Sequence, residues 1–167
     1  STAGNGYGVD KFYATGKVTL TGTNTFSGGL TLSNTTTTVN SGTPQYTQTA
    51  LGTVQVANAN SFAGGNITNG GLFIYDPSAA ESYSGVMSGT GYFIKNSANT
   101  LTLTGNNTFT GTAVVNTGTL QLGAGGTSGS LGSASAIYLP SYASASSLTV
   151  NTSNSNNIIS GIISGIG

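Results

Sequence analysis

The chain has 167 residues, a formal net charge of zero and only 4% charged residues, far below the usual value of about 25%. It contains no cysteine and no histidine, which excludes disulfides and thiol chemistry. Three scattered lysines without any arginine cannot form the basic patch that nucleic-acid binding requires, so we expect no nucleic-acid partner. Hydrophobic residues reach 36%, whereas disordered chains combine low hydrophobicity with high net charge. The composition therefore favours a folded chain.

Pairs of apolar residues at positions i and i+2 recur along the chain and predict short β-strands. Thr, Gln or Phe stands between the two members, so each strand has one apolar face and one mostly hydroxylic face. Glycine pairs such as Gly28-Gly29 and Gly70-Gly71 separate the strands, and no stretch has a helical period. The pairs in chain order are Val18 and Leu20, Leu30 and Leu32, Val54 and Val56, Leu72 and Ile74, Leu101 and Leu103, Leu120 and Leu122, and Leu148 and Val150.

One phrase occurs three times, at residues 18–29, 54–65 and 101–112, as VTLTGTNTFSGG, VQVANANSFAGG and LTLTGNNTFTGT. A repeated phrase indicates a fold made by stacking like units. The phrases start 36 and 47 residues apart, and such unequal spacing suits irregular turns, with each phrase spanning about two coils of roughly 20 residues. We therefore predict an all-β fold, a single right-handed parallel β-helix (β-solenoid) of about eight irregular coils. Residues 1–167 would form one continuous β-solenoid segment with no separate second domain.

The phrase also predicts a structural ladder inside the solenoid. The apolar pairs of the three phrases would point inward as equivalents, and the phenylalanines would form an aromatic stack. An asparagine two residues before each phenylalanine would satisfy buried backbone groups with its amide, or would be a plain surface turn residue. The ladder residues are Phe26, Phe62, Phe109, Asn24, Asn60 and Asn107.

Four tyrosines near predicted loops are candidate interaction aromatics, because an exposed ring can stack on a sugar or on another chain. The alternative is that each ring folds over the edge or the end of the solenoid. These residues are Tyr75, Tyr83, Tyr138 and Tyr142.

Residues 88–126 resemble the passenger-associated repeat of Gram-negative autotransporters, the surface proteins of type V secretion. The resemblance rests on Ser88-Gly89, Lys95 and the runs 100–105, 106–111 and 118–123, with Phe109 in place of the usual Tyr and Asn99 in place of the usual Gly. The phrase at residues 18–29 is similar from Thr19 onward. The resemblance implies a parallel β-helix that is exported through a β-barrel and displayed at the cell surface. It names no ligand.

Catalytic and metal chemistry find little support in the residues present. Asp76 and Glu81 are the only acidic residues near each other, in a proline-containing loop, and glycan cleavage needs paired carboxylates. A solvated turn is the preferred interpretation of this pair, and a glycan-cleaving β-helix enzyme stays a remote alternative. The glycine-rich run 123–129 lacks the aspartates of a calcium-binding repeat. We predict no enzyme activity, no cofactor and no metal.

Two functional hypotheses remain. The first is a non-enzymatic, surface-displayed or secreted β-solenoid that serves as the adhesin stalk or passenger segment of an autotransporter-like protein. The expected partners are host or matrix glycans or proteins, further copies of the chain, or both. Self-association would be end to end or lateral, because a net charge near zero offers little repulsion between copies. The second is a self-assembling extracellular fibre subunit that stacks end to end through open β-helix edges. The sequence starts within a repeat near Gly6 and stops within a repeat at Gly167, which suits either an excised segment of a longer solenoid, the simpler interpretation, or subunits that continue one another. Both hypotheses place the protein outside the cell or at the bacterial cell surface. No stretch approaches 18 apolar residues, so no transmembrane helix is predicted in this segment.

Overall fold

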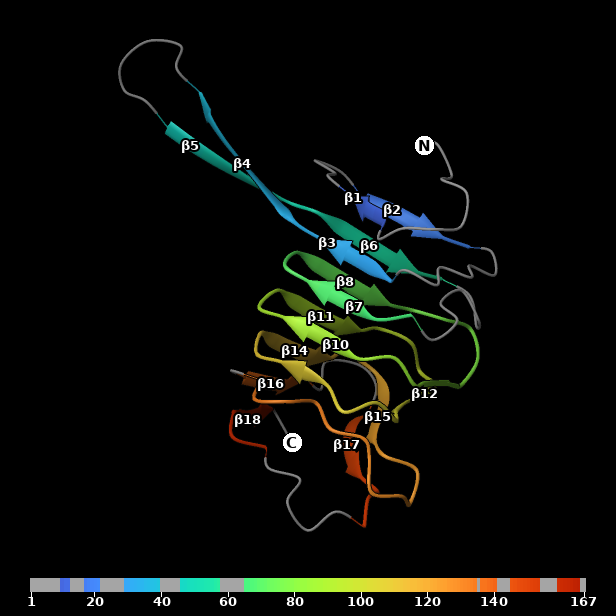
Figure 1. The fold of residues 1–167 in the computed structure, drawn as a ribbon. Helices are drawn as coiled ribbons and strands as arrows, with labels where there is room; N and C mark the ends of the chain where they lie inside the picture. Colours follow the sequence, from blue (N-terminus) through green and yellow to red (C-terminus); the bar gives the residue numbers. More distant parts are fainter. Residues whose placement is uncertain are drawn as a thin grey trace.

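The computed structural model describes residues 10–12, 17–21, 29–39, 46–57, 65–134, 136–140, 145–153 and 159–165. Every regular element among these residues is a β-strand, which confirms the predicted all-β class. The β-branched and hydroxylic residues that dominate the strands suit this class, because they pack well on a pleated surface. Figure 1 shows the strands stacked one above another along the molecule, with β1 and β2 at one end and β18 at the other.

The described residues form four sheets, of which three consist entirely of parallel strands. The five-stranded sheet has the order β1 (Asp10–Phe12), β3 (Leu30–Leu32), β7 (Ile67–Asn69), β10 (Met87–Gly89) and β13 (Thr108–Phe109). The seven-stranded sheet has the order β18 (Ile162–Gly165), β16 (Ala136–Leu139), β14 (Thr112–Val115), β11 (Tyr92–Lys95), β8 (Leu72–Tyr75), β6 (Thr53–Val56) and β2 (Lys17–Leu20). The four-stranded sheet has the order β17 (Ser146–Val150), β15 (Gly118–Leu122), β12 (Thr100–Leu103) and β9 (Glu81–Tyr83).

Between β7 and β15 the chain visits the five-stranded, seven-stranded and four-stranded sheets in turn, three times over. Each strand pairs with the strand one circuit later, so that Ile94 lies opposite both Ile74 and Val114, 20 residues away in each direction. In the four-stranded sheet Leu101 lies opposite Leu120, 19 residues away. One circuit therefore takes about the predicted 20 residues, and neighbouring circuits satisfy each other's backbone groups. This arrangement is compatible with a β-solenoid.

An inserted hairpin interrupts the stacking between β3 and β6. Its strands β4 (Asn34–Val39) and β5 (Tyr46–Leu51) pair antiparallel and form a sheet of their own, and Figure 1 shows this ribbon projecting away from the stacked strands. The insertion explains why Val18 and Val54 lie directly opposite each other although they are 36 residues apart. The prediction that this interval holds two coils is therefore wrong. It holds one circuit lengthened by the hairpin.

The three copies of the repeated phrase do not occupy equivalent positions. Val18 and Val54 are register partners in the seven-stranded sheet, whereas Leu101 belongs to the four-stranded sheet. The expectation that the apolar pairs of all three phrases stack on one another is therefore wrong, although all of them face the interior. The physical reason is that every face of the stack needs inward apolar pairs at i and i+2, so the same short pattern fits any of the three sheets.

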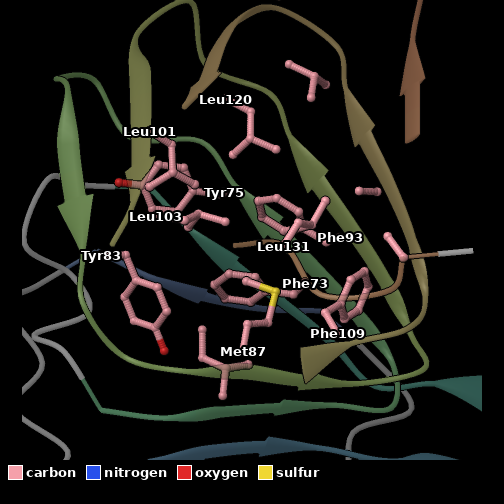
Figure 2. Packing of buried hydrophobic residues seen from close by; sticks show 14 of the residues in the cluster. Phe73, Tyr75, Tyr83, Met87, Phe93, Leu101, Leu103, Phe109, Leu120 and Leu131 are labelled. Carbon is pink, nitrogen blue, oxygen red and sulfur yellow. The ribbon is translucent and has the colours of Figure 1, made fainter. Parts of the chain in front are cut away.

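The inward side chains of the three parallel sheets form one hydrophobic core. Figure 2 shows its central part, with Met87, Phe93 and Phe109 pointing into a common interior from different strands. Phe73 and Phe93 are register partners, and their rings stack with centroids 6.1 Å apart and planes 20° apart. This aromatic pair extends the core along the stacking direction, which is the role that the sequence predicted for the phenylalanines of the repeated phrase.

The strand β8 reverses the orientation expected from the sequence. Leu72 and Ile74 were predicted as the inward pair, yet both are partly exposed, while Phe73 and Tyr75 are buried. The prediction is wrong because all four residues of β8 are apolar or aromatic, so alternation does not define which side faces inward. The larger rings take the interior, where they remove more surface from water. As a result, aliphatic side chains lie on the outside of this sheet.

Candidate interaction surface

On β8, β11, β14, β16 and β18 the outer side of the seven-stranded sheet carries two columns of mostly apolar side chains, which we call the apolar face. On β6 and β2 the same columns continue with Thr53 and Gln55 and with Lys17 and Thr19, which lie outside this face. The register places Leu72, Tyr92, Thr112, Ala136 and Ile162 in the first column, and Ile74, Ile94, Val114, Tyr138 and Ser164 in the second. None of these residues is charged. Tyr92 is 50% exposed, Tyr138 47% and Ile162 72%. Contiguous exposed apolar surface of this kind often marks a site of interaction.

The outer sides of the other two parallel sheets are hydroxylic. In the five-stranded sheet the outward positions of three neighbouring strands are Thr68, Ser88 and Thr108. In the four-stranded sheet, outward hydroxyls of neighbouring strands reach each other, as in the 2.8 Å hydrogen bond between Thr119 Oγ1 and Ser147 Oγ. Among the described residues, an apolar outer surface is therefore confined to β8, β11, β14, β16 and β18 of the seven-stranded sheet.

A polar ladder follows the ends of β8, β11 and β14 at the edge of the apolar face. Asp76, Asn96 and Asn116 stand at equivalent positions 20 residues apart. Asn116 Nδ2 donates to Asn96 Oδ1 at 3.1 Å, Asn96 Nδ2 donates to Asp76 Oδ2 at 3.4 Å, and Gln55 Nε2 donates to the same oxygen at 3.1 Å. The carboxylate of Asp76 is thus one member of a chain of amides that links four successive strands.

Glu81, the other acidic residue of the predicted loop, lies at the start of β9 and is partly buried. It occupies an inward position opposite Leu101, and Tyr75 donates its hydroxyl hydrogen to Glu81 Oε2. The burial of Glu81 raises the pKa of its carboxyl, although the hydrogen bond from Tyr75 acts in the opposite direction. Burial also raises the pKa of the Tyr75 hydroxyl. Both acidic residues of the pair therefore have hydrogen-bond partners within the fold.

The side chain of Lys95 is fully buried in the core, which sequence reasoning missed. Its ammonium donates to Ser97 O at 2.5 Å, to Thr117 O at 2.9 Å and to Ser97 Oγ at 3.4 Å. These oxygens lie in two successive turns, so the ammonium ties neighbouring circuits together. The signal was present in the sequence, because Lys95 follows Phe93 at i+2 and therefore shares its inward side.

Two buried asparagines satisfy backbone groups at the turns. Asn107 accepts a hydrogen bond from Met87 N at 2.6 Å and donates to Ser130 O at 2.5 Å and Gly105 O at 3.2 Å. Asn69, which the sequence did not single out, accepts from Gly71 N at 3.1 Å and donates to Tyr92 O at 3.0 Å. Such contacts matter because an unpaired buried backbone group costs about 1–3 kcal/mol.

The structure places the remaining predicted residues as follows. Phe109 is fully buried, whereas Phe26, Phe62, Asn24 and Asn60 lie outside the described residues, so the structural ladder stays a prediction.

Two of the four candidate interaction aromatics need correction. Tyr75 and Tyr83 are buried, and Tyr83 donates its hydroxyl hydrogen to Gly65 O at 2.5 Å, so neither presents its ring for stacking. Both rings can be buried because each hydroxyl finds an acceptor within the fold, Glu81 Oε2 for Tyr75 and Gly65 O for Tyr83. Tyr138 lies on the apolar face, and Tyr142 lies outside the described residues. Tyr92 is an exposed ring that the sequence did not single out.

Comparison with known families gives a match for two regions of the chain. The family model described as the passenger-associated-transport-repeat matches residues 15–43 and 93–122. No curated protein and no solved structure matches the chain.

The second region that matches the passenger-associated-transport-repeat runs from within β11 to the end of β15. It therefore passes through all three parallel sheets, and it includes the buried side chains of Lys95, Asn107 and Phe109. The repeat family implies an autotransporter passenger region with a secreted or surface-exposed location in Gram-negative bacteria. It suggests a structural passenger region.

Two further observations concern the described residues only. They contain no group of three or more His, Cys, Asp or Glu residues that could hold a metal ion. No helix long and apolar enough to cross a membrane is found among them.

The buried ammonium of Lys95 predicts a rise in stability at alkaline pH. Burial lowers the pKa of Lys95 to about 8 from its ordinary value of 10.5, although the nearby Asp76 raises it. Between these two pH values the folded chain has released a proton that the unfolded chain still holds, so folding becomes more favourable as pH rises. We expect the free energy of unfolding, measured by urea denaturation, to increase by about 1.5 kcal/mol from pH 8 to 9.5.

The matched variants are Lys95→Met, which removes the buried charge, and Lys17→Met, which removes an exposed one. The rise is expected to vanish in Lys95→Met and to persist in Lys17→Met. The quantity compared is the change in the free energy of unfolding with pH. Its value at a single pH is not informative, because Lys95→Met also loses hydrogen bonds to two carbonyls. An equal rise in all three proteins would show that Lys95 is not its source.

Proposed function

We propose that this chain is a non-enzymatic segment of the passenger of an autotransporter-like protein, acting as a displayed or secreted adhesin stalk. The proposal rests mainly on one observation, that the matched repeat lies within the stacked circuits of parallel strands. The match at residues 93–122 covers about one and a half circuits of parallel strands. A unit that stacks on its neighbours in this way can extend a passenger while burying a continuous core.

The proposal includes the finer architecture. Residues 1–167 are one continuous, right-handed parallel β-helix of about eight coils. The register offsets of 19 and 20 residues from β6 to β15 support this proposal, because they set the coil length. Right-handedness is the general preference for crossovers between parallel strands.

The absence of enzymatic activity is part of the same proposal. Asp76 and Glu81 both accept hydrogen bonds from side chains of the fold, which supports a structural role for their carboxylates. A scaffold of this kind would bind host or matrix glycans or proteins through many weak contacts along its outer faces. No single residue would then carry the function.

Protease treatment of intact Gram-negative cells that express the natural gene tests the proposal. An antibody against residues 84–126 follows the chain, and a periplasmic and a cytoplasmic protein serve as controls. We expect added protease to remove the epitope from intact cells, or the epitope to accumulate in the medium, while both controls remain intact. An epitope that is protected in intact cells and missing from the medium would contradict the proposal.

A second candidate is an extracellular fibre subunit that stacks end to end. The last strands favour it, because Val150 and Ile163 occupy inward columns and are each 50% exposed. Uncovered strand edges of this kind can template the addition of another chain. Electron microscopy of the purified chain separates the two candidates: filaments of constant width would support the fibre, and short separate particles would contradict it.

A further inference from the structure

We propose that the apolar face is a lateral contact surface for a second copy of this chain. The biological use of this contact, pairing between displayed passengers, rests on the proposed function. The contact itself is a property of the folded chain and is tested separately from secretion.

The composition of the apolar face is the first argument. Seven of its ten residues are large aliphatic or aromatic residues, from Leu72 to Ile162. In the other two parallel sheets the outward positions from β7 to β17 hold Ser, Thr or Gln. Exposed apolar columns are not needed for folding, because the inward columns already supply the core. The inversion of β8, which turns Phe73 inward and Ile74 outward, gives this face its aliphatic character.

Electrostatics favour a second copy as the occupant. The ten residues of the apolar face include no charged residue, and Lys17, in line with the first column, lies two strands beyond Leu72. The whole chain holds three Lys and three acidic residues for a net charge of zero. Two such faces meet without burying an ion and without like-charge repulsion between the molecules, which is the usual barrier to self-association. A partner that depends on charge for recognition would find nothing complementary on this face.

The register of the two columns allows a self-complementary pair. If two copies are related by a two-fold axis parallel to the stacking direction, the first column of one copy lies over the second column of the other. Tyr138 then faces Ala136, and Tyr92 faces Ile94, so each exposed ring meets a smaller side chain. Large residues opposite small ones are what sheet-on-sheet packing requires.

The size of the apolar face determines how strong the pairing can be. Five strands spaced about 4.8 Å apart and about 13 Å long give roughly 300 Å² per copy in outline. Two copies would bury about 600–800 Å² together, which is below the 1,200 Å² or more of stable interfaces. The proposal is therefore a weak, reversible pair and not a permanent dimer.

Sedimentation velocity of the purified 167-residue chain, from about 10 to 500 µM, tests the proposal. The matched variants are Ile94→Lys on the apolar face and Thr102→Lys on the outer side of the four-stranded sheet. Both residues are partly exposed on central strands, and both changes add one positive charge. We expect the parent and Thr102→Lys to associate with rising concentration, and Ile94→Lys to associate at least about tenfold more weakly.

Circular dichroism checks that each variant is folded, and the milder double variant Ile94→Thr/Val114→Thr replaces Ile94→Lys if that protein unfolds. A parent chain that remains a monomer over the whole range would overturn the proposal. Association that is as strong in the folded Ile94 variants as in the parent would also overturn it, since pairing would then use another surface, such as the ends. None of these results bears on whether the chain is secreted.

Discussion

Unfolding of the Phe109→Ala variant is expected to require about 3–5 kcal/mol less free energy than unfolding of the parent chain. Phe109 is fully buried, and its ring lies so close to Gly111 that a methyl group there would meet the ring at 2.7 Å. Figure 2 places it in the interior shared with Phe93 and Met87. Removing the ring leaves a cavity in close-packed surroundings, so the lost transfer energy and the cavity cost add together.

Urea denaturation of the purified variant measures this change. Tyr138→Ala is the matched control, because it also removes a six-membered ring but from an exposed position on the apolar face. The control is expected to change the free energy of unfolding by less than about 1 kcal/mol. Similar losses in both variants, or unchanged stability in Phe109→Ala, would place Phe109 outside a packed core.

The Gly91→Ala variant is expected to lose about 3 kcal/mol or more, because the alanine methyl has no space. Gly71, Gly91 and Gly111 follow one another on successive circuits just before strands of the seven-stranded sheet. A Cβ at Gly91 would lie 2.3 Å from Gly71 O and 2.7 Å from Asn69 Oδ1. The obstacle is largely backbone, which cannot move without disturbing the pairing of β8 with β11.

The control for this variant is Gly126→Ala, where an added Cβ meets nothing within 4 Å. Thermal unfolding followed by circular dichroism compares the two. We expect Gly126→Ala to match or slightly exceed the parent in stability, because alanine lowers the entropy of the unfolded chain. If Gly91→Ala is as stable as Gly126→Ala, then successive circuits do not approach as closely as the structure places them.

The strands were predictable wherever a polar residue separates two apolar ones. Leu101 and Leu103, with Thr102 between them, can face the interior in only one way, and both are fully buried. The run Leu72–Tyr75 does not define its orientation in this way, because its residues are all apolar or aromatic and either side could face inward. The orientation there depends on how much space the interior leaves for two rings, which is a property of the assembled stack.

The position of each repeat in the stack was harder to predict than its existence. Short i, i+2 pairs fit all three sheets, so the phrases at Val18 and Leu101 look alike and yet belong to different sheets. A better signal was available in the runs GLFIY at residues 71–75 and GYFIK at residues 91–95, which are 20 residues apart and lie in direct register. Comparing the sequence with itself at an offset of 20 residues gives the length of a coil that contains no hairpin insertion.

The candidate interaction surface was only partly predictable. Tyrosine near a loop suggested exposure, but Tyr75 and Tyr83 turn inward because their hydroxyls find acceptors in Glu81 and Gly65. The apolar face was missed altogether, since it depends on the orientation of β8 and of the strands in register with it. The exposure of Tyr92 has the same origin, because its neighbour Phe93 stacks on Phe73 inside the core and Tyr92 therefore points outward.

The most direct test of the stacked, parallel arrangement is disulfide formation between introduced cysteines, which the cysteine-free chain makes unambiguous. Ser82 and Thr102 are register partners, as are Thr102 and Gln121, and all three side chains face outward on the four-stranded sheet. Neighbouring strands bring such pairs within the Cα separation that a disulfide allows, whereas Ser82 and Gln121 are two strands apart, at roughly twice that spacing. Counting free thiols by mass spectrometry after mild oxidation, we expect intramolecular disulfides in the 82/102 and 102/121 double variants and free thiols in the 82/121 variant. Free thiols in both neighbouring pairs, or a disulfide between positions 82 and 121, would contradict the stacking of successive circuits.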